Sequence, residues 1–201
     1  MIRTILFDFG NVLGFFDHSR ALKQLARFTN MDPTELALVL YGGVLEDDYE
    51  IGRISTSEYV EAACKNGWLR CSPVEFQAAF VDIFTENTGV TALIPLLKKN
   101  YRIVLASNTN DAHFRHYCKQ FDHVLKQFDF LGASHQALAR KPHREFYEYC
   151  QRFVNCEPSE CLFVDDLPSN IAAAEAFGWQ GIVLTSAEDL ITRMKALGIR
   201  I

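Results

Sequence analysis

Four short polar segments of this 201-residue chain carry the side chains that could do chemistry. Asp8, the Ser107-Asn108 pair and the Asp165-Asp166 pair each follow a run of apolar residues, and Lys141 lies in an Arg-Lys-Pro segment. Carboxylates that are brought together require a counter-charge, and Mg²⁺ is a hard cation that prefers oxygen ligands. A cation, a lysine and a hydroxyl around a carboxylate make a site for a phosphoryl group, with the carboxylate as a candidate nucleophile.

The apolar runs before these segments predict buried strands. Short, continuous apolar runs suit the centre of a parallel sheet that is covered by helices. The predicted strands are residues 4–7, 102–106, 161–164 and 181–184, with 128–131 as a weaker fifth. Helical patterns lie between them at residues 91–99, 111–120, 144–153 and 170–177. This alternation predicts an α/β fold with a doubly wound parallel sheet, in which ligands bind at the carboxyl ends of the strands.

Residues 16–88 interrupt this alternation, and we expect no strand among them. The segments 32–35 and 72–75 each have a capping residue first, then Pro, and Glu at the third helical position, while Ser55 to Glu58 offers a capping box. These signals mark the starts of helices. We therefore expect an α/β core formed by residues 1–15 and 89–201, with a small α-helical insertion formed by residues 16–88.

Composition restricts the possible partners. Lys and Arg total 20 against 25 Asp and Glu, and the formal net charge of −5 argues against nucleic-acid binding through a general basic surface. The richest apolar stretch, residues 92–97, is too short to span a membrane, and Asp8 interrupts the only N-terminal apolar run. The six cysteines form no CxxC pair and are expected to be reduced. The sequence predicts a soluble cytoplasmic protein without nucleic-acid or membrane partners, and it leaves the oligomeric state open.

In sequence order, the four segments resemble the four motifs of the haloacid dehalogenase superfamily of phosphatases. Residues 7–12 (FDFGNV) are similar to the first motif and residues 106–110 (ASNTN) to the second. Lys141-Pro142 is similar to the third, and residues 164–170 (VDDLPSN) to the fourth. One such motif alone is a weak signal, whereas four in order at strand ends are specific. Nearly the whole predicted core is covered by this resemblance.

In this superfamily, an insertion between the first two motifs is a cap that closes over the site. Residues 49–55 (YEIGRIS) are similar to a turn in the helical caps of one branch. That branch includes small bacterial sugar phosphatases and the phosphatase domain of soluble epoxide hydrolase. The resemblance therefore implies that the helical insertion is a cap, and that a sugar phosphate is the favoured substrate among small phosphorylated metabolites.

The resemblance also implies a Mg²⁺-dependent reaction through an aspartyl-phosphate. Asp8 would attack the phosphorus and would bind the metal together with Asp166 and the backbone carbonyl of Gly10. The implied phosphate-binding residues are Ser107, Asn108 and Lys141, and Lys141 would also pair with the nucleophile. As supporting residues, Asp165 would orient a metal-bound water or Lys141, and Asn170 would brace the fourth motif.

Gly10 departs from the family's pattern. Phosphatases of this family usually carry an Asp at that position as the general acid and base, a role worth about 10²- to 10⁴-fold in rate. Three alternatives follow: a slow phosphatase that takes its proton from water or a cap residue, a 2-haloacid dehalogenase-type hydrolase, or a low-turnover phosphate-binding or regulatory protein. Asp17 and His18 are candidate replacements for the acid. We favour the phosphatase, because Asp165-Asp166 is a metal-binding pair and carboxylate attack on a carbon–halogen bond needs no metal.

Two further segments have unremarkable expected roles. Glu46-Asp47-Asp48 is expected to be a solvated loop. Phe15 and Phe16 are expected to take part in ordinary core packing, with a place in the cleft between core and cap as the alternative.

Overall fold

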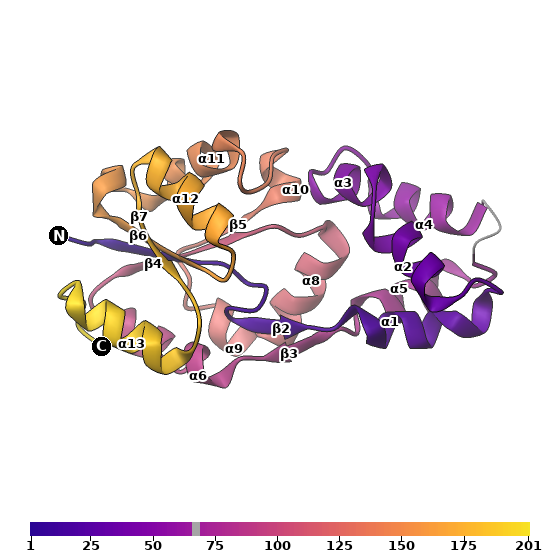
Figure 1. The fold of residues 1–201 in the computed structure, drawn as a ribbon, viewed down its shortest axis with the longest axis horizontal. Coiled ribbons are helices and arrows are strands. Elements are labelled where there is room, and N and C mark those ends of the chain that lie inside the picture. The colour runs from indigo at the N-terminus through magenta and orange to yellow at the C-terminus, as the bar shows by residue number, and fades with distance from the viewer. Residues whose placement is uncertain (66–68) are drawn as a thin grey trace.

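The computed structural model describes residues 1–65 and 69–201 and places a five-stranded sheet at the centre of the core (Figure 1). The strands are β1 (Thr4–Phe7), β4 (Arg102–Ser107), β5 (Phe130–Ala133), β6 (Cys161–Asp165) and β7 (Gln180–Val183). Their order is β5-β4-β1-β6-β7, and every neighbouring pair is parallel. The predicted doubly wound α/β fold is confirmed.

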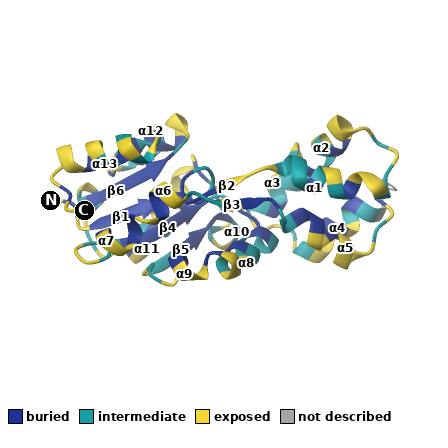
Figure 2. Ribbon diagram, turned by 90° about the horizontal axis from the view of Figure 1, so that it is seen from below, coloured by how far each residue is buried: buried dark blue, intermediate teal, exposed yellow. Residues whose placement is uncertain are grey.

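Helices cover both faces of this sheet. Ile5 and Phe7 of β1 belong to one apolar cluster and Leu6 to the other, as the period of two along a strand requires. The first face packs against α6 (Thr88–Thr91), α7 (Ile94–Leu97), α8 (Asp111–Gln120), α9 (Asp122–Leu125) and α13 (Ala187–Ala196). The second packs against α11 (Arg144–Val154) and α12 (Pro168–Phe177). Figure 2 shows the resulting buried sheet between partly exposed helices.

Two of the predicted core elements differ from the structure. The helix expected at residues 91–99 is replaced by α6 and α7, with Pro95 in the first turn of α7. Proline has no N–H to donate to the carbonyl four residues earlier, so one continuous helix cannot run through this position. The fifth strand lies at Phe130–Ala133 rather than at 128–131, because Asp129 turns its carboxylate back to the Ile103 N–H, 2.9 Å away.

The described part of the inserted segment contains five α-helices, which lie beyond the carboxyl ends of the strands (Figure 1). They are α1 (His18–Leu25), α2 (Pro33–Tyr41), α3 (Val44–Glu50), α4 (Thr56–Lys65) and α5 (Pro73–Val81), with a 3-10 turn at Ala26–Phe28. Both capping boxes expected before α2 and α5 are present. The helices enclose an apolar cluster of their own, whose largest buried side chains are Tyr49, Tyr59 and Phe76.

A two-stranded antiparallel ribbon joins the insertion to the core, so the expectation of no strand within residues 16–88 is wrong. It pairs β2 (Gly14–Phe16) with β3 (Phe84–Glu86). Strands of three residues are too short to show an alternating pattern, and this pairing depends on residues about 70 positions apart. The core-packing expectation for Phe15 and Phe16 is also wrong, because their side chains on this ribbon are 47% and 40% exposed.

The acidic segment Glu46-Asp47-Asp48 lies in α3, so the loop expectation is wrong. Carboxylates in the first turn of a helix interact favourably with its dipole, which explains how so acidic a segment is helical.

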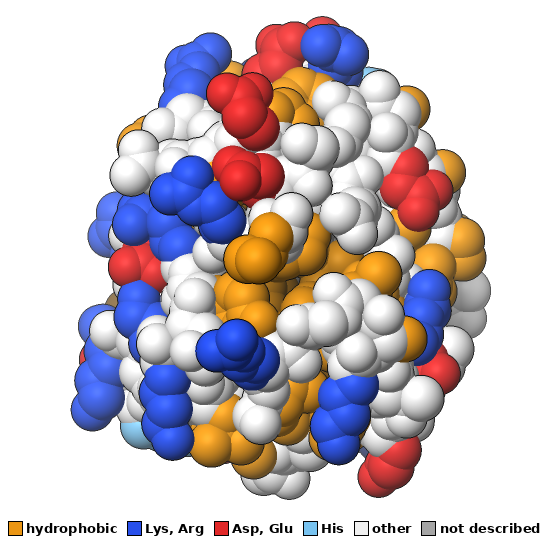
Figure 3. Space-filling model, turned by 90° about the vertical axis from the view of Figure 1, so that its left-hand side faces the viewer, with side chains coloured by type: hydrophobic (Ala, Val, Ile, Leu, Met, Phe, Trp, Pro, Cys, Tyr) orange, Lys and Arg blue, Asp and Glu red, His pale blue; other side chains and the backbone are white. Residues whose placement is uncertain are grey.

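The surface of the core mixes charges of both signs. Figure 3 views the end opposite the inserted helices and shows hydrophobic side chains near its centre, surrounded by basic and acidic ones. All six cysteines are free thiols. Within the part of the chain that the structure describes, no helix has the length and apolar character needed to cross a membrane.

Candidate active site

A buried lysine shared by two aspartates forms the centre of the site. The Lys141 Nζ lies 2.8 Å from Asp8 Oδ1 and 2.7 Å from Asp165 Oδ2, and the lysine side chain has no exposed surface. The parallel register of β1 and β6 pairs Phe7 with Val164, so the next residue of each strand is an aspartate. The sheet register therefore determines the distance between the two carboxylates.

Burial and charge act against each other in this group. Burial raises the pKa of Asp8, Lys141 opposes that rise, and the neighbouring Asp165 adds to it. Burial alone would lower the pKa of Lys141, but attraction to Asp8 and Asp165 outweighs it and the pKa is raised. Lys141 is therefore an ammonium ion at neutral pH, and it supplies the positive charge that two buried carboxylates require.

Asp165 has its hydrogen-bonding capacity filled by the protein. Its Oδ1 accepts from the Leu167 N–H at 2.8 Å and from Asn170 Nδ2 at 3.0 Å. Its Oδ2 accepts from Lys141 at 2.7 Å and from the same Asn170 amide at 3.1 Å. Asp165 and Asn170 thus hold Lys141 in place, an arrangement in keeping with their predicted supporting roles.

Three carboxylates converge beside this lysine. Ligand oxygens of Asp8, Asp165 and Asp166 all lie within 4.8 Å of one another. Asp166 is held by the Asn11 amide at 3.1 Å, and Asp8 Oδ1 is occupied by Lys141 and by the Phe9 N–H at 2.7 Å. Asp8 Oδ2 accepts no hydrogen bond from any described residue. The donor set consists of hard oxygens, and it fits a Mg²⁺ ion.

Asn108 connects the second predicted motif to the third. Its amide donates to the Lys141 carbonyl at 3.0 Å, and its carbonyl accepts from the Lys141 N–H at 2.8 Å. The side chain predicted to bind phosphate therefore fixes the backbone of Lys141. Ser107 ends β4 and is buried, and its hydroxyl makes a long 3.4 Å contact with the Asn108 carbonyl. That hydroxyl is available for a further acceptor.

A cavity of about 100 Å³ lies over this site, between the core and the inserted helices. The core contributes Phe9, Gly10, residues 107–110, His113 and Tyr117, and the insertion contributes Phe16, His18, Glu46 and Glu50. So small a space suits a phosphoryl group together with part of a compact substrate. Of the two candidate replacements for the missing acid, His18 lines this cavity, whereas Asp17 caps α1 by accepting from the Ser19 N–H at 2.9 Å.

Two residues of the cavity were missed by the sequence analysis. Glu46 was assigned to a solvated loop, although its spacing of four from Glu50 places the two on one helix face once α3 is known. Tyr117 is 1% exposed, and its hydroxyl has no hydrogen-bond partner among the described residues. No sequence signal distinguishes Tyr117 from an ordinary core aromatic residue.

A parallel α/β sheet with carboxylates and a lysine at its carboxyl edge, covered by an inserted helical unit, defines a class of hydrolases. The chain belongs to the haloacid dehalogenase-like hydrolase family, whose model matches residues 2–178.

The chain is similar to a curated phosphatase and to solved structures of the same family. The chain is 28% identical over 187 residues to the D-ribitol-5-phosphate phosphatase of Bacteroides thetaiotaomicron, covering 90% of each sequence. The structure of a haloacid dehalogenase-like hydrolase from Porphyromonas gingivalis superimposes with a TM-score of 0.82 at 25% identity, over 100% of both chains. A family enzyme of B. thetaiotaomicron, crystallised with magnesium and inorganic phosphate, superimposes with a TM-score of 0.80 at 22% identity, over 92% of this chain and 95% of that one.

Proposed function

We propose that this protein is a Mg²⁺-dependent phosphatase that hydrolyses a small phosphorylated metabolite through an aspartyl-phosphate on Asp8. The observation that carries the proposal is the buried Lys141 ammonium between Asp8 and Asp165, which leaves one oxygen of Asp8 without a partner in the described chain. An oriented carboxylate oxygen beside a fixed positive charge is suited to nucleophilic attack on phosphorus.

Each side chain of the site has a separate role in phosphoryl transfer. Asp8 Oδ2 attacks phosphorus in line with the leaving oxygen, while Lys141 binds both the nucleophile and a phosphoryl oxygen. The Ser107 hydroxyl donates to a second phosphoryl oxygen, and backbone N–H groups of the loop after Asp8 and of Asn108 complete the binding site. Water then attacks the phosphorus of the aspartyl-phosphate and releases phosphate, which regenerates the Asp8 carboxylate.

Asp8, Asp166 and the Gly10 carbonyl would hold the metal ion. When bound, Mg²⁺ neutralises the charge of the nucleophile and of the phosphoryl oxygens. Asp165 serves Lys141 instead, because its oxygens accept from Lys141, Leu167 and Asn170.

For the substrate, we propose a phosphorylated sugar or sugar alcohol. The D-ribitol-5-phosphate phosphatase that aligns with 90% of this chain supports that class. We further propose that residues 1–15 and 89–201 act as the catalytic core and residues 16–88 as the cap that encloses the substrate. The cavity lined by both parts supports this division.

We expect Mg²⁺-dependent phosphate release from one or more members of a panel of sugar, sugar-alcohol and nucleoside phosphates. The Gly10→Asp variant tests whether a missing acid limits the rate on the same panel. Chloroacetate, assayed with and without Mg²⁺, is expected to release no halide. Metal-free halide release would overturn the proposal in favour of a dehalogenase, and Mg²⁺ binding without turnover of any phosphomonoester would indicate a binding protein.

Mg²⁺ is expected to stabilise the folded chain. A ligand at 100 times its Kd stabilises the native state by about 2.7 kcal/mol, because it binds that state and not the unfolded one. The thermal midpoint should therefore rise with Mg²⁺ concentration and return after chelation. Asp166→Asn removes a carboxylate from the metal site and should reduce the rise, whereas Asp189→Asn, at a partly exposed position of α13, should not. An equal rise in both variants would contradict the assignment of Asp166.

A further inference from the structure

The acid that Gly10 cannot supply must come from elsewhere in the cavity, unless solvent supplies it. Among the described residues, the carboxylates that line the cavity are Glu46 and Glu50, both on α3. Glu50 is committed to an ion pair, with its Oε2 at 2.7 Å from Arg140 Nη1. Glu46 makes no hydrogen bond or ion pair with any residue of the described ranges.

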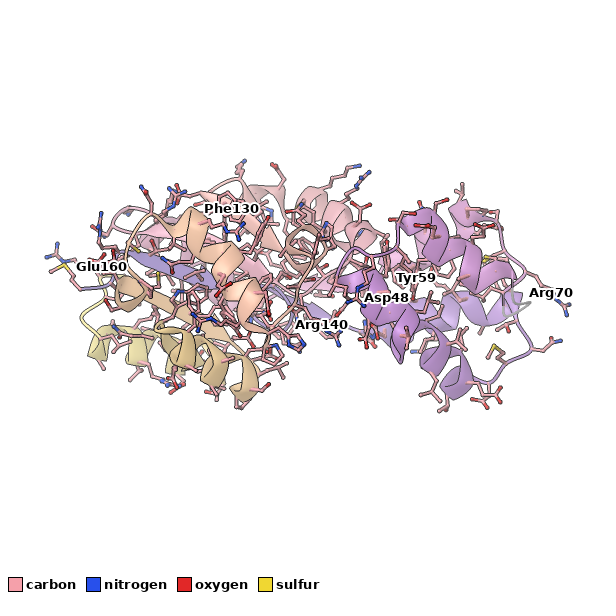
Figure 4. The ribbon with its side chains drawn as sticks, turned by 90° about the horizontal axis from the view of Figure 1, so that it is seen from above. Asp48, Tyr59, Arg70, Phe130, Arg140 and Glu160 are labelled. Atoms are coloured by element: carbon pink, nitrogen blue, oxygen red, sulfur yellow. The ribbon has the colours of Figure 1, made fainter. Side chains whose placement is uncertain are left out.

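Several contacts fix α3 on the core. Arg140 contacts Asp47 at 2.6 Å and Glu50 at 2.7 Å, and the Ser134 hydroxyl donates to the Glu50 carbonyl at 2.7 Å. Directly after the helix, Gly52 packs so closely that an added Cβ would lie 2.2 Å from the His135 carbonyl oxygen. Figure 4 shows Arg140 at this junction, near the inserted helices. The C-terminal end of α3 is therefore held at a defined place beside the site.

Glu46 lies one helical turn before Glu50, and residues four apart share a helix face. The anchored end of α3 thus directs Glu46 into the same cavity as Gly10 and Ser107. Core and insertion supply opposite walls of this small space, so a substrate whose phosphate lies on Ser107 and Lys141 extends its leaving group toward α3.

We propose that Glu46 is the general acid and base of this enzyme, acting from the inserted helices in place of the Asp that Gly10 replaces. This inference depends on the proposed phosphatase function. It assigns a catalytic role to a residue outside the four motifs.

The surroundings of Glu46 favour a protonated carboxyl before the reaction. Burial, followed by repulsion from Glu50, raises the pKa of Glu46 to about 7, with Asp47 adding to the rise and Arg140 opposing it. The other titratable groups nearby are His18, whose pKa burial lowers, and Tyr41, whose pKa burial and Glu46 raise. A pKa near the working pH lets one group donate and then accept a proton.

The two proton transfers balance over one cycle. As the Asp8 oxygen bonds to phosphorus and the bond from phosphorus to the leaving oxygen breaks, the Glu46 carboxyl gives its proton to that oxygen, which leaves as an alcohol. The Glu46 carboxylate then takes a proton from water as the water oxygen bonds to phosphorus and the bond from phosphorus to Asp8 breaks. Phosphate departs, and Asp8 and Glu46 return to their initial states.

The test compares Glu46→Gln with Asp48→Asn, a control on the same helix whose carboxylate pairs with the exposed Arg53 and not with the core, using substrates whose leaving groups differ. With an alkyl phosphate such as glycerol phosphate or a sugar phosphate, Glu46→Gln should lower kcat by about 10²- to 10³-fold, because an alkoxide needs a proton to leave. With p-nitrophenyl phosphate, whose leaving group needs none, the first turnover should stay within about tenfold of wild type. A burst of nitrophenolate, equal in amount to the enzyme, should then precede slow turnover, because the variant lacks the base that assists water attack on the aspartyl-phosphate. Asp48→Asn should show no burst and nearly wild-type rates.

Adding Gly10→Asp to Glu46→Gln provides a rescue. A Cβ at Gly10 would lie 3.1 Å from Phe16 Cε1, and the half-exposed Phe16 ring has room to move. The double variant should recover at least tenfold in alkyl phosphate turnover, an effect that a structural role for Glu46 would not produce.

Undiminished alkyl phosphate turnover in Glu46→Gln would overturn the inference while leaving the phosphatase function standing. Equal losses with both substrates, without a burst and without rescue, would overturn it as well. A parallel His18→Gln variant that alone shows the leaving-group dependence would transfer the role to His18. Absence of Mg²⁺-dependent turnover of any phosphate by the wild-type protein would instead refute the proposed function itself.

Discussion

Asp8→Asn is expected to lower kcat for phosphate release by at least about 10⁴-fold, because the amide cannot form the acyl-phosphate bond. The substitution preserves the shape of the side chain, and Asp165 remains 2.7 Å from Lys141 as its counter-charge. We therefore expect the variant to fold. Its thermal unfolding midpoint should lie no more than a few degrees below that of the wild type. The loss of activity would then result from the missing nucleophile and not from unfolding of the variant.

The measurement combines steady-state turnover with trapping of the phosphoenzyme. Wild-type protein quenched in acid during turnover should carry an acid-stable, hydroxylamine-labile phosphate on the peptide that contains Asp8, and Asp8→Asn should carry none. Asp122→Asn, at an exposed position of α9, is the matched control and should behave as wild type. Activity above one-tenth of wild type in Asp8→Asn, or label on another residue, would refute the assignment of the nucleophile.

The sequence allowed the core and its edge residues to be predicted for a local physical reason. Strands buried on both faces are continuous apolar runs, and the polar residue that follows each run marks the edge where ligands bind. Asp8, Ser107 and Asp165 could therefore be placed near one another before their distances were known. The pairing of Asp8 and Asp165 with Lys141 follows from the register of β1 against β6 and from the Asn108 amide that holds the Lys141 backbone.

The parts that could not be predicted depend on contacts between distant segments. The ribbon of β2 and β3 pairs residues about 70 positions apart, and neither strand is long enough for a hydrophobic pattern. The composition of the acidic segment of α3 is that of a solvated surface, and it therefore predicts a loop. Its place over the cavity is determined by Arg140, nearly a hundred residues away, and no local pattern encodes that contact.

The same separation of local and global properties explains how an acidic chain can bind an anion. The net charge of −5 describes the mean field at a distance, whereas the site contains a buried ammonium within 2.8 Å of the nucleophile. Inside a low-dielectric site, a charge at such a distance outweighs exposed charges that water and salt screen. The same buried ammonium also stabilises the fold, because Asp8 and Asp165 are both removed from water.

Lys141→Met is accordingly expected to destabilise the folded protein by about 3–5 kcal/mol at pH 7, in addition to abolishing turnover. Methionine matches the length of the lysine stem but leaves Asp8 and Asp165 without a counter-charge, and Asp165 has no exposed side-chain surface. In wild type, the pKa of Lys141 is raised above the unfolded lysine value of about 10.4. The contribution of Lys141 to the free energy of unfolding is therefore fully present below that unfolded value and is lost as the pH rises through the higher folded value.

The stability of the Lys141→Met variant should depend on pH in a way that identifies the cause of its destabilisation. Without the ammonium, nothing opposes the effect of burial, which raises the folded pKa of Asp8 above its unfolded value of about 4, so this carboxyl is tolerated when protonated and becomes destabilising as the pH rises. The deficit measured by urea unfolding should therefore be small near pH 4 and grow toward pH 8. Lys126→Met, which removes an exposed lysine from α9, is the matched control and should change stability by less than about 1 kcal/mol at either pH. A deficit independent of pH would show that lost packing, and not the unpaired carboxylates, accounts for the destabilisation.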